Sequence, residues 1–255
     1  MVKICQKVNP CKNAGKKDVA TGRCKCVGAW TGTTCNALAR DCWTYLVNHA
    51  IEDGNKLLLI QPAISTSPFY VSCYLHSSGS GIGSAFFAVH DRGSIGFDRT
   101  WQEYVDGFGQ DLTTVTFPSS YFMGLERLHQ ITSNAKSYNL ILSLEFSDGS
   151  KSTLNYRNFK VGDATVNYKL SYTSFTQAAG RTSNPTNNEF EIESSKSPKN
   201  MAFSTPDRDN DQSPTNCATS AKSGWWFNDC TTTPLFSSTP RWGGRDLKRI
   251  LLAVA

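Results

Sequence analysis

The sequence has no long apolar run. Its longest apolar stretches are short segments such as 57–60 and 250–255, far below the roughly 18 residues that a membrane-spanning helix requires. The opening residues, MVKICQKVNP, lack the apolar region of a signal peptide. We therefore predict no membrane insertion. With no signal peptide visible, the chain is either a mature or partial chain or a cytosolic one.

The sequence also lacks a large excess of charge of either sign. Lysine and arginine number 26 against 21 aspartate and glutamate residues, and the net charge is +5. The basic residues are spread out, except in RWGGRDLKR at 241–249. A nucleic-acid-binding protein usually gathers its basic residues on one face, so we predict no nucleic-acid partner.

Enzyme motifs are missing as well. The sequence contains no P-loop, no H-E-x-x-H and no G-x-S-x-G. The four histidines, at 49, 76, 90 and 129, fall in predicted strands, strand ends or a helix, with no serine or cysteine nucleophile motif around them. A hydrolase needs a nucleophile beside a base, so we predict that the protein is not an enzyme.

Cysteine, in contrast, is plentiful and unevenly placed. Five of the nine cysteines lie within residues 5–35, where apolar residues are too few to build a core. Such a density predicts disulfide cross-links in place of a core, and so an oxidising compartment. This favours a secreted, extracellular protein over a cytosolic one.

From Arg40 onward the sequence is typical of an antiparallel sheet with a few helices, in short apolar runs broken by glycine, proline and serine. We predict helices within 98–108, capped by Asp98, and within 121–132. We predict strands at 57–62, 68–75 and 166–175, and a hairpin across 138–161. Residues 176–200 are polar and predicted to form a loop, and a loop that long is usually functional or stabilised by a bound group.

Residues 5–35 resemble an EGF-like module. The opening NPCKNAG and the closing C-x-C-x8-C spacing match, but the third of the six cysteines is missing. For a module over 1–37 the resemblance implies the disulfides Cys11–Cys24 and Cys26–Cys35 and leaves Cys5 unpaired. An odd cysteine predicts either a covalent homo-oligomer or a free thiol. A degenerate module is the alternative.

Residues 40–255 resemble the fibrinogen C-terminal domain. The matching segments stand in order: RDCWTYL, FDRTWQEYVDGFG, YFMGLERLHQIT, NYRNFKVGDATVNYKLS, MAFSTPDRDNDQSPTNCA, SGWWFNDC and DLKRI. The resemblance implies an α+β fold with the disulfides Cys42–Cys73 and Cys217–Cys230. It also implies three parts: a small sheet over 40–83, a central sheet with flanking helices over 84–180 plus 246–254, and a loop-rich ligand subdomain over 181–242.

An acidic run lies in the predicted ligand subdomain. Asp207, Asp209 and Asp211 alternate in DRDNDQ, and calcium prefers several oxygen ligands of this kind. An EF-hand would need glycine at Gln212 and glutamate at Ala218, so that interpretation fails. A solvated acidic turn is the remaining alternative.

The fibrinogen-related pattern instead implies Ca2+ as the cofactor. Its ligands would be the side chains of Asp209 and Asp211 and the backbone carbonyls of Ser213 and Thr215, with Asp207 supporting the loop. The alternation predicts that Arg208 and Asn210 point away from the metal.

Ficolins and tachylectins, the lectin-like members of this family, hold acetyl groups beside the calcium site. The corresponding ligand-binding positions here are Ala221, Asp229, Cys230 and Thr231, with a cis peptide bond implied between Asp229 and Cys230. Ala221 replaces an aromatic residue, Thr231 replaces a common histidine, and the segment 231–244 is shortened. The acetyl pocket is therefore modified, while Trp225 and Trp226 are predicted to pack in the core.

Two functions follow from the resemblance. The first is a secreted, calcium-binding lectin of the innate-defence type, which binds extracellular glycans or acetylated surface groups through a modified pocket. The second is an extracellular-matrix, adhesion or receptor-ligand module, like those of tenascins and angiopoietins, which binds a cell-surface protein.

Overall fold

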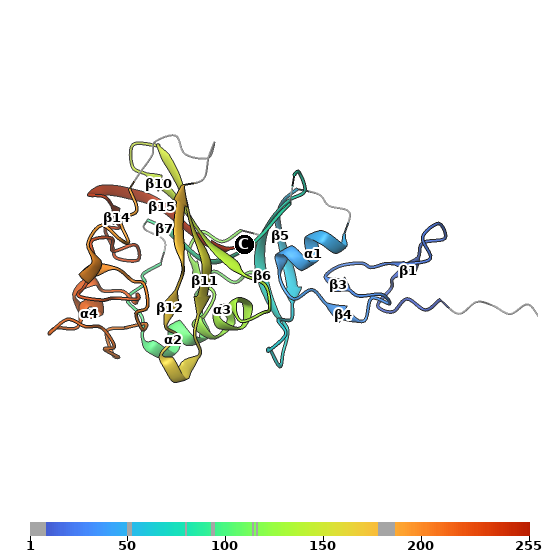
Figure 1. Ribbon diagram of the computed structural model, residues 1–255, viewed down its shortest axis with the longest axis horizontal. Helices are drawn as coiled ribbons and strands as arrows, with labels where there is room; N and C mark the ends of the chain where they lie inside the picture. The colour runs from blue at the N-terminus through green and yellow to red at the C-terminus, as the bar shows by residue number, and fades with distance from the viewer. Residues whose placement is uncertain are drawn as a thin grey trace, which may run out of the picture.

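A computed structural model describes residues 9–49, 53–79, 81–92, 95–113, 115, 117–177 and 187–255 (Figure 1). The strands are β1 (Lys16–Lys17), β2 (Cys24–Lys25), β3 (Trp30–Thr31), β4 (Ala37–Leu38), β5 (Gly54–Ile60), β6 (Phe69–His76), β7 (Ile82–Asp91), β8 (Phe108–Gly109), β9 (Tyr121–Phe122), β10 (Tyr138–Phe146), β11 (Lys151–Val161), β12 (Leu170–Ser171), β13 (Ser174–Gln177), β14 (Arg241–Trp242) and β15 (Arg245–Val254). The α-helices are α1 (Cys42–Asn48), α2 (Trp101–Asp106), α3 (Leu125–Thr132) and α4 (Cys217–Ala221), and 3-10 turns lie at Ala164–Val166 and Ser194–Lys196.

One large antiparallel sheet forms the body of the molecule. Its main path runs β12-β11-β10-β15-β7-β6-β5. Buried and half-buried residues alternate along β10 without interruption, because successive side chains of a strand point to opposite faces. The predicted hairpin over 138–161 and the return of the C-terminal strand to the central sheet are both confirmed.

The small sheet predicted for 40–83 is continuous with the central one. Strands β5 and β6 form a hairpin, and β6 continues the hydrogen bonding onto β7 between Cys73–His76 and Ile82–Ala85. Helix α1 was not predicted from the sequence, and the disulfide Cys42–Cys73 ties it to β6. Asp41 caps this helix and accepts a hydrogen bond from the Thr44 N–H at 2.6 Å.

Two local predictions are wrong. Helix α2 is capped by Thr100 and not by Asp98, in a capping box in which the Glu103 carboxylate accepts from the Thr100 N–H at 2.9 Å. The strand predicted over 166–175 is split into β12 and β13. Asn167 and Tyr168 both take φ of +51°, which a strand does not allow, so β12 begins only at Leu170, and Tyr172 and Thr173 separate it from β13.

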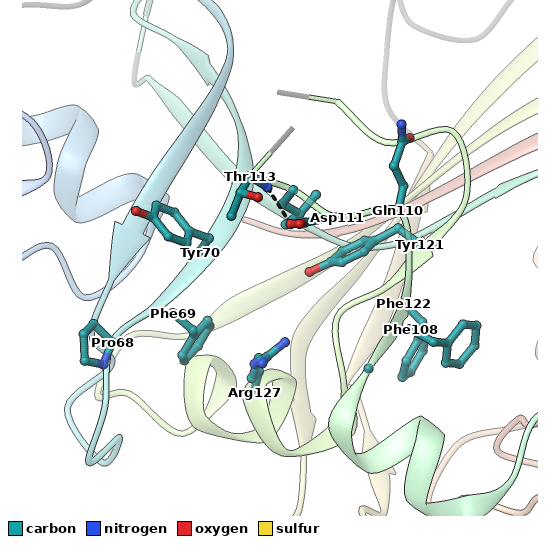
Figure 2. A pocket seen from close by; sticks show the side chains of 12 residues that line it. Pro68, Phe69, Tyr70, Phe108, Gln110, Asp111, Thr113, Tyr121, Phe122 and Arg127 are labelled. Carbon is teal, nitrogen blue, oxygen red and sulfur yellow. Dashed lines mark hydrogen bonds between the residues drawn. The ribbon is translucent and has the colours of Figure 1, made fainter. Parts of the chain in front are cut away.

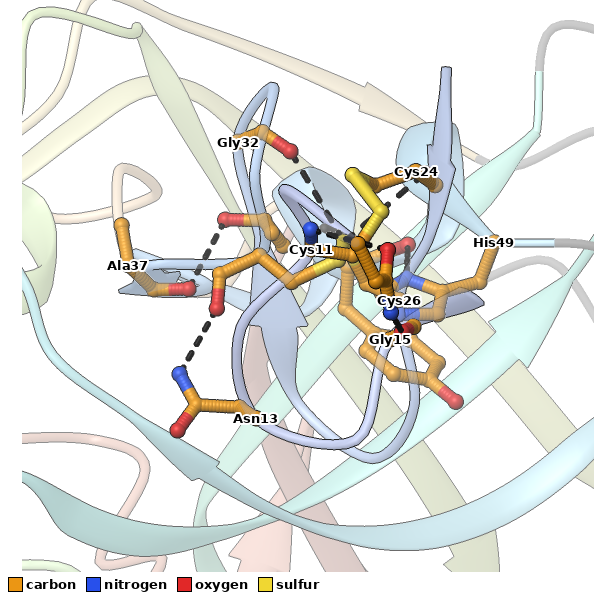
Figure 3. Close-up of a disulfide and its surroundings, with 12 residues drawn as sticks. Cys11, Asn13, Gly15, Cys24, Cys26, Gly32, Ala37 and His49 are labelled. Atoms are coloured by element: carbon orange, nitrogen blue, oxygen red, sulfur yellow. Dashed lines mark hydrogen bonds between the residues drawn. A yellow bond between two sulfur atoms is a disulfide. The ribbon is translucent and has the colours of Figure 1, made fainter. Parts of the chain in front are cut away.

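The N-terminal segment, residues 9–39, consists of two small hairpins, β1-β2 and β3-β4. The disulfides Cys11–Cys24 and Cys26–Cys35 join the same pairs that the EGF-like resemblance implies (Figure 3). Gly15 fits among them, since a Cβ there would lie 2.7 Å from the Cys35 sulfur. The EGF-like identity of this segment stays a prediction, and Cys5 lies outside the described residues.

A backbone hydrogen bond joins this segment to the large sheet. The Gln61 N–H, just after β5, donates to the Ala39 carbonyl at 2.9 Å, and the Ala39 N–H in turn donates to the Ala29 carbonyl inside the segment at 2.8 Å. The β3-β4 hairpin therefore lies beside α1, while β1 and β2 project away from the body (Figure 1).

Candidate functional site

The acidic run lies in the loop between the central sheet and α4. Asp207 supports this loop: its carboxylate accepts hydrogen bonds from the Trp101 N–H at 2.9 Å and from the Thr205 hydroxyl at 2.8 Å. Because Trp101 is the first residue of α2, this carboxylate ties the loop to the body of the protein. Asp207 is thus held by the fold and not directed at Asp209 and Asp211.

Asp209 and Asp211 lie together on the loop. The Asp211 N–H donates to Asp209 Oδ1 at 3.2 Å. The Asp211 carboxylate accepts from the Ser213 N–H and the Cys217 N–H, each at 2.9 Å. Burial raises the pKa of Asp211, and the neighbouring Asp209 charge raises it further. The two carboxylates therefore repel each other at a place where a cation would relieve the repulsion.

The two predicted carbonyl ligands follow directly along the chain. Within the described part of the chain, the carbonyls of Ser213 and Thr215 accept no hydrogen bond. Asn216 then caps α4, accepting from the Thr219 N–H at 2.9 Å, and the disulfide Cys217–Cys230 closes the far side of the loop. The donor set of two carboxylates and two uncommitted carbonyls fits a hard cation such as calcium.

No cluster of three or more histidine, cysteine, aspartate or glutamate side chains that could hold a metal occurs among the described residues. A site of the kind implied here does not require one, because half of its protein ligands are backbone carbonyls.

Arg208 and Asn210 contact the body of the protein. The Arg208 guanidinium lies 4.0 Å from the centre of the Trp101 ring and donates to the Asn167 side chain at 2.8 Å. Asn210 donates from Nδ2 to the Phe203 carbonyl at 2.7 Å. These two residues therefore hold the loop in place, and replacing either is expected to disturb the fold.

The four candidate ligand-binding residues include Cys230 of the disulfide Cys217–Cys230 and lie close to this disulfide along the chain. Ala221 is half-buried against the core, Asp229 is exposed, and the Thr231 hydroxyl contacts the Thr233 hydroxyl at 3.2 Å. The peptide bond between Asp229 and Cys230 is trans, so the expected cis bond is not found. Cys230 itself adopts φ +53° and makes the turn.

Trp225 and Trp226 are buried, 3% and 1% exposed, within an aromatic cluster of this subdomain. The Trp226 indole donates to the Tyr168 carbonyl at 2.8 Å, and its ring lies 4.9 Å from that of Phe203. The indole N–H of Trp225 is buried without a partner among the described residues. Both tryptophans pack in the core, as the sequence analysis predicts.

A hydrogen-bonded chain of Asp53, His76 and Ser78 was not predicted from the sequence. Asp53 Oδ2 lies 2.6 Å from His76 Nδ1, and the Ser78 hydroxyl lies 2.5 Å from His76 Nε2. The adjacent letters HSS were the available signal. The Asp53 and His76 side chains are 45% and 33% exposed, whereas catalysis by such a chain relies on a water-excluded site. The contacts of Asp53 and Ser78 with His76 instead hold the last residue of β6 in place.

Comparisons with known proteins agree with this architecture. The family model described as the C-terminal globular domain of fibrinogen beta and gamma chains matches residues 38–248. The human fibrinogen gamma chain is 35% identical over 198 residues, which is 75% of this chain and 42% of that protein. Human fibrinogen-like protein 1 is 35% identical over 181 residues, 70% of this chain and 55% of that protein. This chain thus spans about half the length of these relatives or less.

Solved structures show the same fold. The fibrinogen-like globe domain of human ANGPTL2 superimposes with a TM-score of 0.67 at 23% identity, covering 85% of this chain and 98% of that one. Lamprey fibrin D-dimer in complex with the peptide ligand Gly-His-Arg-Pro-amide gives a TM-score of 0.69 at 23% identity, covering 84% and 72%. The predicted α+β fibrinogen-like fold is confirmed.

Fibrinogen-like domain proteins, the angiopoietins among them, are extracellular and non-enzymatic, which confirms the prediction that this chain is not an enzyme. Over the described residues, no helix has the length and apolar character needed to cross a bilayer. With the family model matched across most of its length, the chain belongs to the family of fibrinogen C-terminal globular domains.

Proposed function

We propose that the chain is an extracellular recognition module whose loop over 207–217 binds Ca2+. The observation that carries this proposal is the pairing of the Asp209 and Asp211 carboxylates beside the two uncommitted carbonyls of Ser213 and Thr215. Nearby, Asp207 and Asn210 bond to Trp101 and Phe203, and Asn216 donates to the carbonyls of Thr205 and Pro206, so hydrogen bonds on both sides hold this loop in place.

Calcium would neutralise the two carboxylates and cross-link a loop that has little apolar mass of its own. Only two charged ligands contribute, so we expect weak binding, suited to extracellular calcium at about 10⁻⁴–10⁻³ M. The protein holds the loop by the hydrogen bonds from Ser213 and Cys217 to Asp211 and by the disulfide Cys217–Cys230.

The first ligand class that we propose is a glycan or an acetylated surface group, which would bind near Ala221, Asp229, Cys230 and Thr231. The support is the position of these residues beside the calcium loop. This is a modified lectin site, because Ala221 and Thr231 present a methyl group and a hydroxyl where the lectins of the family have an aromatic ring and an imidazole.

The second ligand class is a cell-surface protein, in an adhesion or receptor-ligand role. The small side chains of Ala221 and Thr231 favour this alternative, because they replace the aromatic ring and the imidazole of the acetyl-binding arrangement. The peptide held by lamprey fibrin D-dimer gives further support, since a protein of this fold there binds a peptide.

Thermal unfolding with calcium and with chelator tests the metal proposal. We expect calcium to raise the melting temperature of the wild type and to have no effect on Asp209→Ala or Asp211→Ala. Saturation at 100 times the dissociation constant would stabilise by about 2.7 kcal/mol, so a weak site at millimolar calcium gives less. Asp229→Asn is the matched control, because it removes an exposed carboxylate from the same subdomain and should keep the calcium effect.

Asn210→Ala is expected to lower the melting temperature equally with and without calcium, because Asn210 bonds to the fold. Equal melting of the wild type under both conditions would show that the acidic run is a solvated turn.

A glycan array, run with calcium and with chelator, separates the two ligand classes. Calcium-dependent binding to acetylated sugars supports the lectin. Binding to a cell-surface protein alone, with a silent array, supports the adhesion or receptor-ligand role.

A further inference from the structure

A cavity with polar groups at its base lies far along the chain from the loop over 207–217. It encloses about 370 Å³ between the start of β6 and the segment that runs from β8 through β9 to α3 (Figure 2). Phe69 and Tyr70 of β6 form one wall, and Phe108 and Phe122 line the other side. Aromatic side chains therefore line two sides of the cavity, which lies where two separate parts of the sheet meet.

The hydroxyl of Tyr121 is the unusual feature of this cavity. Tyr121 is 6% exposed, and its hydroxyl is buried with no hydrogen-bond partner among the described residues. Figure 2 shows the hydroxyl directed into the cavity, toward the side on which Phe69 and Tyr70 lie, with Arg127 below it. A buried polar group without a partner costs free energy, and native proteins seldom keep one without a reason.

Tyr121 is an O–H donor at every physiological pH. Burial raises the pKa of its hydroxyl far above the ordinary value, and the Arg127 charge only partly opposes this. An acceptor that enters the cavity would therefore find a hydrogen-bond donor at its floor and not a phenolate.

Arg127 supplies the charge. Its guanidinium lies 5.7 Å from the centre of the Phe69 ring and donates one hydrogen bond, to the Met123 carbonyl at 3.2 Å. In the described part of the chain, no carboxylate forms an ion pair with it. Since a guanidinium carries five N–H donors, most of its capacity remains for a ligand.

Few other polar groups are available to a ligand here. The Asp111 carboxylate, which accepts from the Thr113 N–H at 2.8 Å, is an acceptor and offers a ligand no donor, and the Gln110 side chain points away from the cavity in Figure 2. A sugar would need many hydrogen bonds, which this lining does not offer. An apolar body with a single anionic group matches it better.

We propose that this cavity binds a carboxylate carried on an aromatic or apolar body, with Arg127 holding the anion and the Tyr121 hydroxyl donating to it. Phe69 and Tyr70 pack against the apolar part. The Arg127 side chain, long and exposed at its end, moves aside from the tyrosine hydroxyl as the carboxylate enters. The ligand is a free aromatic acid or the C-terminal residue of a peptide, and both present the same chemistry.

Isothermal titration of the 255-residue chain tests this proposal. The probes are N-acetylphenylalanine and its amide, which lacks the carboxylate, together with a short peptide ending in phenylalanine as the acid and as the amide. We expect saturable binding of the acids and a loss of at least about tenfold for the amides, the size of a lost charge-assisted hydrogen bond. A peptide acid that binds tighter than the free acid identifies a peptide C-terminus as the source.

The variants assign the two donors. Tyr121→Phe removes only the hydroxyl and should weaken the acids without affecting the amides. Arg127→Lys keeps the charge but loses the planar fork and should also weaken the acids. Arg245→Met is the matched control, because Arg245 also lies over a phenylalanine ring but is paired with Asp148 away from this cavity.

Equal affinity for acids and amides, no saturable binding, or unchanged binding by Tyr121→Phe and Arg127→Lys would each overturn the proposal. Chelator should leave the binding unchanged, so the outcome is independent of the calcium site.

Discussion

Two regions of the molecule hold their shape with little regular secondary structure, and they do so differently. In residues 9–39 the strands have two residues each, and apart from Cys35 and Ala39 few side chains are buried. In residues 187–242 there are one five-residue helix and one short strand, but the aromatic side chains Phe190, Phe203, Trp225, Trp226, Phe236 and Trp242 are buried.

The first region depends on cross-links and the second on packing. Two disulfides close the N-terminal hairpins, while in the second region one disulfide accompanies a continuous chain of ring contacts with centroids 4.9 to 5.9 Å apart. A loop-rich region is therefore stable either because disulfides restrict its unfolded chain or because it buries a large apolar area. A calcium ion bound at the acidic run would stabilise the second region locally, in a third way.

Removing the N-terminal disulfides should have the largest effect. With Cys11, Cys24, Cys26 and Cys35 all changed to serine, we expect the hairpins to unfold, since each native disulfide of a small domain contributes about 2–5 kcal/mol. Hydrogen exchange should show loss of protection over residues 9–39 and unchanged protection in β10 and β15. Loss of protection in both regions would show that the N-terminal segment also supports the sheet.

Truncating the Trp226 side chain should destabilise the packed region, residues 187–242. Trp226→Ala is expected to cost about 3–5 kcal/mol, because a fully buried ring and its hydrogen bond to the Tyr168 carbonyl are both lost. Chemical denaturation measures the change. Trp30→Ala is the control, a half-buried tryptophan in the cross-linked region, and a cost as large as that of Trp226→Ala would contradict the contrast.

Acidification should weaken the packed region through His90. Burial lowers the pKa of this imidazole below 6.5, and it contacts the Leu235 carbonyl through Nδ1 at 2.9 Å. The hydrogen bond with the Leu235 carbonyl and the Asp91 charge raise the same pKa and Arg92 lowers it, but burial has the largest effect, so the net shift is downward. The unfolded chain therefore takes up a proton first, and stability present above about pH 6.5 is lost as the pH falls toward the folded-state pKa.

Denaturation at neutral pH and about one unit below the ordinary histidine pKa measures this loss. His90→Gln should reduce the pH dependence of the free energy of unfolding. The control His76→Gln, at a half-buried histidine outside this region, should reduce it less. An unchanged slope in His90→Gln would place the titration elsewhere.

Cys5 should have the smallest effect on stability. We predict that it makes the oxidised chain prone to covalent dimers, because the EGF-like pattern leaves it without a partner. Non-reducing electrophoresis of wild type and Cys5→Ser measures this. A monomeric wild type with a free thiol would exclude the dimer.

The sequence determined the fold family and the local patterns. Ordered motifs from RDCWTYL to DLKRI indicated the fibrinogen-like fold, and strict alternation over 138–146 predicted β10. The same pattern placed Asp209, Asp211, Ser213 and Thr215 in one short loop, because residues that are close in sequence stay close in space.

The tertiary structure decided the features that join distant segments. Only the fold showed that β6 pairs with β7, that Arg208 lies on Trp101, and that Tyr121 lies buried near Arg127 in one cavity with Phe69. Helix α1 was also missed, since Asp41 is recognisable as its cap only once the disulfide and the Tyr138 hydroxyl hold the segment in place. Contacts of this kind depend on how the whole chain packs, and local sequence does not specify them.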